Sequence, residues 1–154
     1  MFGLMVVILL KTFQNIWKCL IPYIYNMYNS IFRYRKIDRK IFKKNKGYLG
    51  YVNDHHVIPR QHQNHRILRI INFDIHSNFN LFIMPTREGI TRFNLHPDTM
   101  IHTCHPNYNK YIKKELDIIY NKCETKDEYE YNIWLLVNYL KDNLVFNREK
   151  IPWI

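Results

Sequence analysis

The stretch YVNDHHVIP, residues 51–59, predicts the first strand of the fold and holds two adjacent histidines. It mixes β-branched, aromatic and polar residues, as a short strand over residues 51–58 would, and Pro59 stops it. Successive strand residues point to opposite faces of a sheet. His55 and His56 therefore enter one pocket together only if the strand bends or turns at that point.

A second short strand is predicted at residues 80–85, NLFIMP, after a polar turn. A short helix is expected between the two strands, at residues 64–71. Pro106 suits the first position of a longer helix that runs to about Cys123. The buried side of this helix is expected to carry Ile112, Leu116, Ile119 and Tyr120.

The last predicted helix covers roughly residues 125–146, where apolar side chains recur three and four positions apart. The residues expected to face inward are Tyr129, Ile133, Leu136, Val137, Leu140 and Leu144. The order is strand, strand, helix, with further helices appended. We therefore expect an α+β fold with a small ββα core.

The net charge of +10 is concentrated at one end of the 154-residue chain. Residues 1–48 hold ten Lys and Arg against the single acid Asp38, which gives +9, whereas the other 106 residues contribute only +1. Clustered cations attract nucleic-acid backbones and anionic lipid headgroups by the same field. We expect a basic arm at residues 1–48 and a single domain at residues 49–154, with its motif core at residues 51–120.

Three segments make up this arm. The apolar run at residues 2–10 is shorter than the ~20 residues of a membrane-spanning helix. Residues 11–32 carry a helical stripe, with Pro22 as a kink, that fits either the protein's own core or a membrane or partner surface. Residues 33–46 are strongly basic, as in a solvated linker or in a segment that lies along nucleic acid. Residues 1–46 could also contact an anionic membrane.

The three cysteines, Cys19, Cys104 and Cys123, are odd in number and lack C-x-x-C spacing. They indicate neither a disulfide framework nor a ribbon-type zinc site. We expect them to be reduced, which favours a reducing intracellular compartment.

All eight histidines lie between His55 and His105. His102 and His105 are three apart, a spacing that puts both on one side if the segment is helical. Imidazole is a common ligand for divalent transition metals and a common general base. The structural alternatives are a helix cap at His105, beside Pro106, and a surface loop at His102.

Three blocks occur in a fixed order, namely DHHVIP at residues 54–59, NLFIMP at 80–85 and IHTCHPNYNKYI at 101–112. Together they resemble the AHH nuclease family of the His-Asn-His and endonuclease VII superfamily. The resemblance covers about residues 51–120. It implies a ββα-metal site in a treble-clef-like fold.

The resemblance also implies roles for individual residues. His55 would bind the metal, and His56 would be the general base that deprotonates water. Asn80 would orient this base or its loop, while His102 and His105 would complete the metal shell. The implied cofactor is one divalent ion, Mg²⁺, Zn²⁺, Ni²⁺ or Mn²⁺, which stabilises the pentavalent phosphorus and the leaving 3′ oxygen.

Further residues follow from the same resemblance and from its departures. Tyr108 would support the site. Asp54 stands where the family name has alanine and could be a ligand or an anchor behind the ligands. Leu81 stands where the family usually has glycine, which suggests another backbone path after Asn80. The last two histidines have two intervening residues where three are expected, which makes His96 a further candidate ligand.

Arginines follow the first strand. Arg60, Arg66 and Arg69 could hold phosphates bidentately, or they could form a solvated helix face. His62, His65 and His76 are expected to be exposed or to have structural hydrogen bonds.

The leading hypothesis is a metal-dependent endonuclease that cuts DNA or RNA with little sequence preference, because no base-reading motif occurs and the basic arm favours backbone contacts. One alternative is a metal-stabilised nucleic-acid-binding module without turnover. Another is a membrane-associated basic protein whose histidines are structural.

Overall fold

A computed structural model of the chain describes residues 36–146 and 151–153. The apolar run and helical stripe expected at residues 2–32 lie outside this part. The elements are α2 (Lys36–Asn45), β1 (Val52–His56), α3 (Arg66–Ile70), β2 (Leu81–Pro85), α4 (Arg87–Arg92), α5 (Pro106–Lys122) and α6 (Lys126–Phe146), with 3-10 turns at Arg60–His62 and Asn78–Asn80. This mixture of helices and a small sheet confirms the α+β class.

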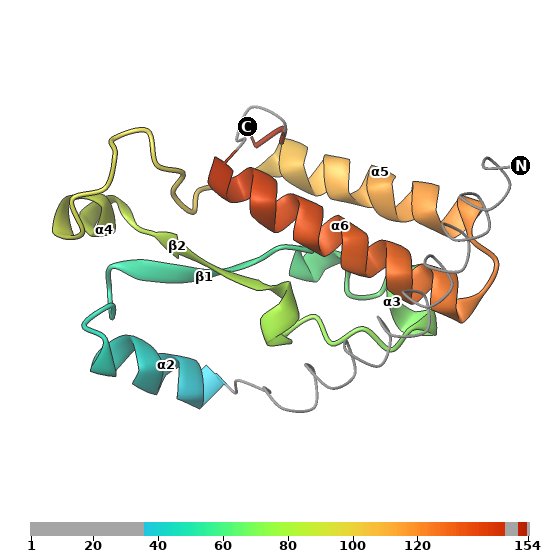
Figure 1. Cartoon of the computed structure of the whole chain (residues 1–154), viewed down its shortest axis with the longest axis horizontal. Coiled ribbons are helices and arrows are strands. Elements are labelled where there is room, and N and C mark those ends of the chain that lie inside the picture. Colours follow the sequence, from blue (N-terminus) through green and yellow to red (C-terminus); the bar gives the residue numbers. More distant parts are fainter. Residues whose placement is uncertain (1–35, 147–150, 154) are drawn as a thin grey trace, which may run out of the picture.

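The two strands pair antiparallel, with Val52 opposite Pro85 and His56 opposite Leu81. Figure 1 shows α2 below this sheet and the long helices α5 and α6 above it. Both strands stand where the sequence predicted them, although Asn80 belongs to the 3-10 turn that precedes β2. Leu81, expected to redirect the backbone, has an ordinary extended conformation (φ −104°, ψ 142°), so no glycine is required there.

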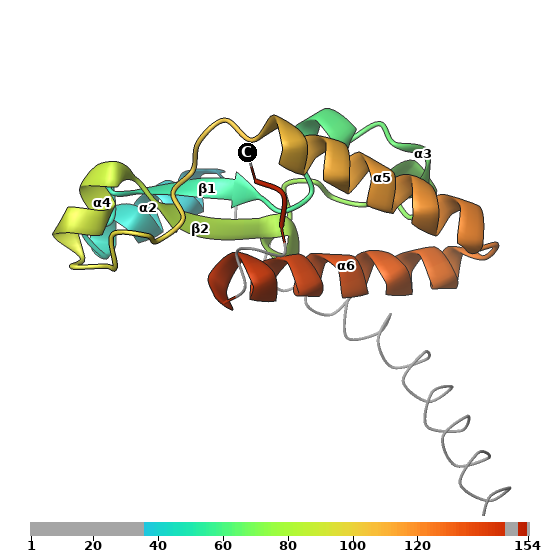
Figure 2. The ribbon, with the colours of Figure 1, turned by 90° about the horizontal axis from the view of Figure 1, so that it is seen from above.

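The helices α5 and α6 form an antiparallel hairpin, and Figure 2 shows them running side by side. A capping box starts α6, because the Thr125 hydroxyl accepts from the Glu128 backbone N–H at 3.3 Å and the Glu128 carboxylate accepts from the Thr125 N–H at 3.1 Å. All six residues expected to face inward on α6 are buried. Within the described residues, no helix combines the length and apolar character that crossing a membrane requires.

The helix α4 was not predicted, since residues 87–92 show no apolar period. Its start is set by Thr86, whose hydroxyl accepts from the Gly89 backbone N–H at 3.1 Å. A Cβ at Gly89 would lie 2.0 Å from the Tyr51 carbonyl oxygen. Glycine at this position therefore lets α4 pack directly on the chain entering β1.

The side chain of Asn80 is completely buried, at 0% exposure, and joins the two strand ends. Its Oδ1 accepts from the Ile58 backbone N–H at 2.7 Å. Its Nδ2 donates to the carbonyl oxygens of Ile58 at 3.0 Å and Ile75 at 2.9 Å. One carboxamide thus satisfies both backbone groups of a residue just after β1 and links them to the turn before β2.

The neighbouring residue Val57 is held from the opposite direction. Tyr108, in the first turns of α5, donates its hydroxyl proton to the Val57 carbonyl oxygen. Burial raises the pKa of Tyr108, so its hydroxyl remains a donor at neutral pH. This bond joins the start of α5 to the end of β1.

We predict that Asn80→Ala lowers the free energy of unfolding by about 3 kcal/mol, because it leaves buried backbone groups without partners. Asn80→Asp should be at least as harmful, since a carboxylate would face the two carbonyl oxygens that Nδ2 now contacts. Urea unfolding followed by circular dichroism measures both effects. Asn64→Ala, at an exposed position, is the control, and equal stability of the Asn64 and Asn80 variants would contradict the prediction.

Candidate metal centre

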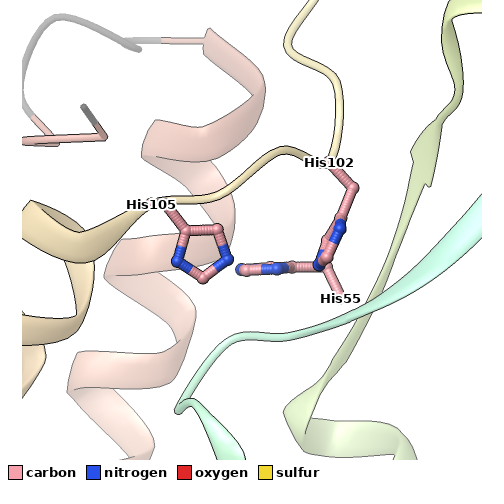
Figure 3. A group of neighbouring side chains, drawn as sticks. All are labelled: His55, His102 and His105. Carbon is pink, nitrogen blue, oxygen red and sulfur yellow. The ribbon is translucent and has the colours of Figure 1, made fainter.

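Three histidines from two distant segments converge beside the start of α5. His55 comes from β1, and His102 and His105 come from the loop that precedes α5. One ring nitrogen of each lies within 4.8 Å of the others. Figure 3 shows the rings of His102 and His105 turned toward His55.

Two ring nitrogens of this triad, whose members range from buried His55 to exposed His102, are buried and suit a cation-binding site. His55 is 1% exposed, and its Nε2 is buried without a partner among the described residues. His105 Nδ1 is likewise buried and unpartnered. Orphaned buried nitrogens are costly, and a shared metal ion would satisfy both at once. The donor set therefore fits a bound divalent metal ion.

The electrostatics favour the neutral form of two of these histidines, His55 and His102. Burial, followed by the charges of His105 and His102, lowers the pKa of His55 to about 3. Burial, followed by the charge of His105, also lowers the pKa of His102. Neutral imidazole is the form that binds a metal, so these side chains are ready to ligate at neutral pH.

The helical argument for His102 and His105 was wrong, because residues 101–105 have no helical structure. His105 is the residue just before α5 (φ −137°, ψ 66°), and Pro106 occupies the first helical position. The side chain of His105 makes no capping hydrogen bond. An irregular loop therefore turns both rings toward His55.

Trp153 is a site neighbour that the sequence analysis missed. Its ring centroid lies 4.6 Å from that of His105, 5.2 Å from that of His55 and 5.2 Å from that of Tyr108. No local pattern links it to the triad, because it follows α6 and meets His55 only through the tertiary fold. Tyr108, which the resemblance placed behind the site, does lie against His55, at 5.6 Å between centroids.

His56 has different neighbours from His55, as strand alternation requires. Its Nε2 lies 3.1 Å from Nδ1 of His76, a residue expected to have no role in the site. Burial, followed by the charges of His76 and Arg60, lowers the pKa of His56 to about 4. His56 is therefore a neutral base at pH 7.

Asp54 does not join the metal-binding group. Its carboxylate binds Arg39 at 3.1 Å and Lys43 at 2.8 Å, both from α2. Asp54 was expected to be either a ligand or an anchor behind the ligands. The first of these roles is corrected, because its carboxylate is paired with these two cations and is not part of the histidine group. The same contacts fasten α2, part of the expected basic arm, to the strand that carries His55 and His56.

The arginines expected to hold phosphate separate in space. The charge of Arg60 reaches His56 and contributes to its lowered pKa. Arg66 instead lies over the ring of Tyr120, 5.3 Å from its centroid. Tyr120 is near the far end of α5, about 20 Å along the helix from His105. The structure therefore places Arg66 away from the triad.

The remaining histidines have partners elsewhere. His62 Nε2 lies 3.0 Å from the Asn109 carbonyl oxygen, and His65 Nε2 lies 3.0 Å from an Asp117 carboxylate oxygen. Both contacts join the chain after β1 to α5. His96, the further candidate ligand, is exposed and lies 3.6 Å from Asp98. It is not part of the triad.

A hollow of about 510 Å³ lies between α4 and the loop that precedes α5. Thr103 and Trp153 line it on the side of the histidines, and Arg87 lines it on the side of α4. It is large enough for a nucleotide-sized ligand.

Comparisons with known proteins give one match. The family model AHH, described as a nuclease family of the HNH/ENDO VII superfamily with conserved AHH, matches residues 38–133. No curated protein and no solved structure matches the chain. The match spans more than half of the chain, includes every member of the triad and begins within α2. The chain therefore belongs to the AHH nuclease family of the HNH/ENDO VII superfamily.

Proposed function

We propose that the protein is a metal-dependent endonuclease that hydrolyses phosphodiester bonds in DNA or RNA with little sequence preference. Membership of a nuclease family supplies the reaction class and makes nucleic acid the substrate. The observation that carries the metal dependence is the convergence of His55, His102 and His105, with ring nitrogens within 4.8 Å of one another.

The triad favours a transition metal. Imidazole suits Zn²⁺ and Ni²⁺, whereas Mg²⁺ prefers carboxylate and water oxygens, and the described triad contains no carboxylate. Three protein ligands leave further coordination positions open for water or phosphate, as in catalytic zinc sites. When bound, the ion would supply positive charge to the phosphoryl and leaving oxygens.

His56 is the proposed general base. If its proton is carried on Nε2 and donated to His76 Nδ1, the lone pair on its own Nδ1 is left to accept a proton from water. His76 would then fix both the tautomer and the ring orientation of the base. Arg60, whose charge acts on His56, would hold a substrate phosphate.

The geometry restricts how a substrate binds. His55 and His56 point to opposite faces of β1, and β1 ends at His56. A phosphodiester that meets both side chains must therefore lie across the end of this strand. The hollow lined by Arg87, Thr103 and Trp153 gives the adjoining nucleotide a place beside the triad.

The helix α2 would contribute affinity without sequence reading. Its Arg39 and Lys43 are bound to Asp54, whereas Lys40 and Lys44 are exposed and one turn apart. Exposed lysines attract phosphates along a nucleic-acid backbone regardless of base sequence. Anionic membrane contact through residues 1–46 stays a prediction, because most of these residues lie outside the described part.

The second candidate is a nucleic-acid-binding module that keeps the metal and has no turnover. The direction of His56, away from the triad, favours it. The variants below separate these two functions.

We expect His55→Ala and His105→Ala each to weaken Zn²⁺ binding, because each removes a ligand. The loss should exceed the roughly 10–100-fold that is typical when a residue behind a metal ligand is replaced. Calorimetric titration of the metal-free full chain with Zn²⁺ measures this loss. His96→Ala, at an exposed histidine, is the matched control and should bind as the parent does. EDTA should abolish cleavage, and Zn²⁺ should restore it. Equal affinity in the parent and His55→Ala would rule out the triad as the metal site.

His56→Ala should keep parental Zn²⁺ affinity and lose about 10²–10⁴-fold in cleavage rate, the usual contribution of a general base. Plasmid and RNA cleavage at saturating metal measures the rate. His62→Ala, which changes a histidine bonded to α5, is the control. Cleavage at the parental rate by His56→Ala would remove it as the base. A parent that binds Zn²⁺ but never cleaves would support the binding module.

Replacing Lys40 and Lys44 together by Gln should weaken nucleic-acid binding and flatten its salt dependence, by about 0.9 in the log–log slope for each phosphate that is no longer neutralised. Fluorescence anisotropy over a salt series measures the slope. The control replaces Lys114 and Lys122, also exposed, on α5. If both pairs change the slope equally, α2 has no special part in binding.

A further inference from the structure

The chain beyond α6 returns to the metal centre. Ile151 is 3% exposed and belongs to the hydrophobic core. Trp153, two residues later, lies against the rings of His55, His105 and Tyr108. Figure 2 shows this short segment beside the start of α5 and over the end of β1.

A polar contact joins Trp153 to the loop that carries two of the ligands. Its indole N–H donates to the Thr103 hydroxyl oxygen at 3.2 Å. Thr103 stands between His102 and His105 in a stretch without regular secondary structure. The indole ring therefore lies against the rings of His55 and His105, and its N–H binds the loop that carries His102 and His105.

From these contacts we infer that Trp153 is a positioning residue of the metal centre, which holds the 101–105 loop and the His105 ring in the ligating arrangement. This inference rests on the metal dependence proposed above. An irregular loop loses conformational freedom when its side chains ligate a metal, and contacts that order it beforehand raise affinity. Partners behind metal ligands typically contribute 10–100-fold to metal affinity.

The contact involves a segment outside the part of the chain that the family model matches. Residues 151–153 lie beyond the family match, which ends at residue 133. Trp153 is half-buried, whereas Ile151 is in the core, so the segment has separate anchoring and site-facing residues. Substitutions can therefore separate a general loss of stability from a specific effect on the ligands.

The test titrates the metal-free full chain with Zn²⁺, with thermal unfolding measured in parallel. Trp153→Ala should weaken Zn²⁺ binding by about 10–100-fold. Trp153→Phe and Thr103→Val both remove the indole–hydroxyl bond, so each should give a smaller loss, and the double variant should bind no more weakly than the weaker single variant. Ile151→Ala is the matched control, and it should lower the melting temperature while the parental affinity is kept.

Titration with Co²⁺ adds a second readout, because its visible absorption reports ligand geometry. Trp153→Ala should change this spectrum, and Ile151→Ala should not. Parental Zn²⁺ affinity in Trp153→Ala would overturn the inference while the triad stands. Equal losses of affinity in Trp153→Ala and Ile151→Ala would also overturn it, in favour of a purely structural tail. If the parent binds neither ion, the metal centre itself fails, and the role of Trp153 fails with it.

Discussion

Val57 and Ile58, which follow the paired histidines, are held by buried hydrogen bonds from two different elements, and the geometry of the site depends on these bonds. Asn80 binds both backbone groups of Ile58, and Tyr108 binds the carbonyl oxygen of Val57. One partner belongs to the turn before β2 and the other to α5. These bonds fix the backbone at the end of β1. The fixed backbone directs His55 toward the loop that carries His102 and His105. A strand end exposed to water could not fix a ligand in this way.

Because β1 is a regular strand, the adjacent side chains of His55 and His56 lie on its opposite faces, in different surroundings. On one face, His55 lies among aromatic rings, where burial favours neutral imidazole. On the other, His56 shares its surroundings with charged groups, including the Asp54 carboxylate bound to α2. The separation keeps the proposed metal ligand and the proposed general base adjacent in sequence without letting them compete for one partner.

The elements that the sequence predicted are those whose signal is local. The capping box at Thr125 and Glu128 and the apolar period of α6 depend on neighbours within one or two turns, and Pro106 marks the start of α5 in the same way. The resemblance also identified the histidines that converge as the triad. The errors concern contacts that no local pattern encodes. The position of Asp54 before the paired histidines suggested a ligand or an anchor behind the ligands, but its partner Arg39 lies on a different element. Trp153 was missed because it meets His55 only through the tertiary fold.

The distances along the chain between these contacts also set an order of assembly. The α5–α6 hairpin is made of neighbours in sequence, and such local structure forms fastest. The Trp153–His55 contact closes a loop of about a hundred residues. Because closing a long loop costs conformational entropy, we expect this contact to form late in folding. The indole beside the three histidines is therefore among the last parts of the fold to be put in place, after the helices that surround it.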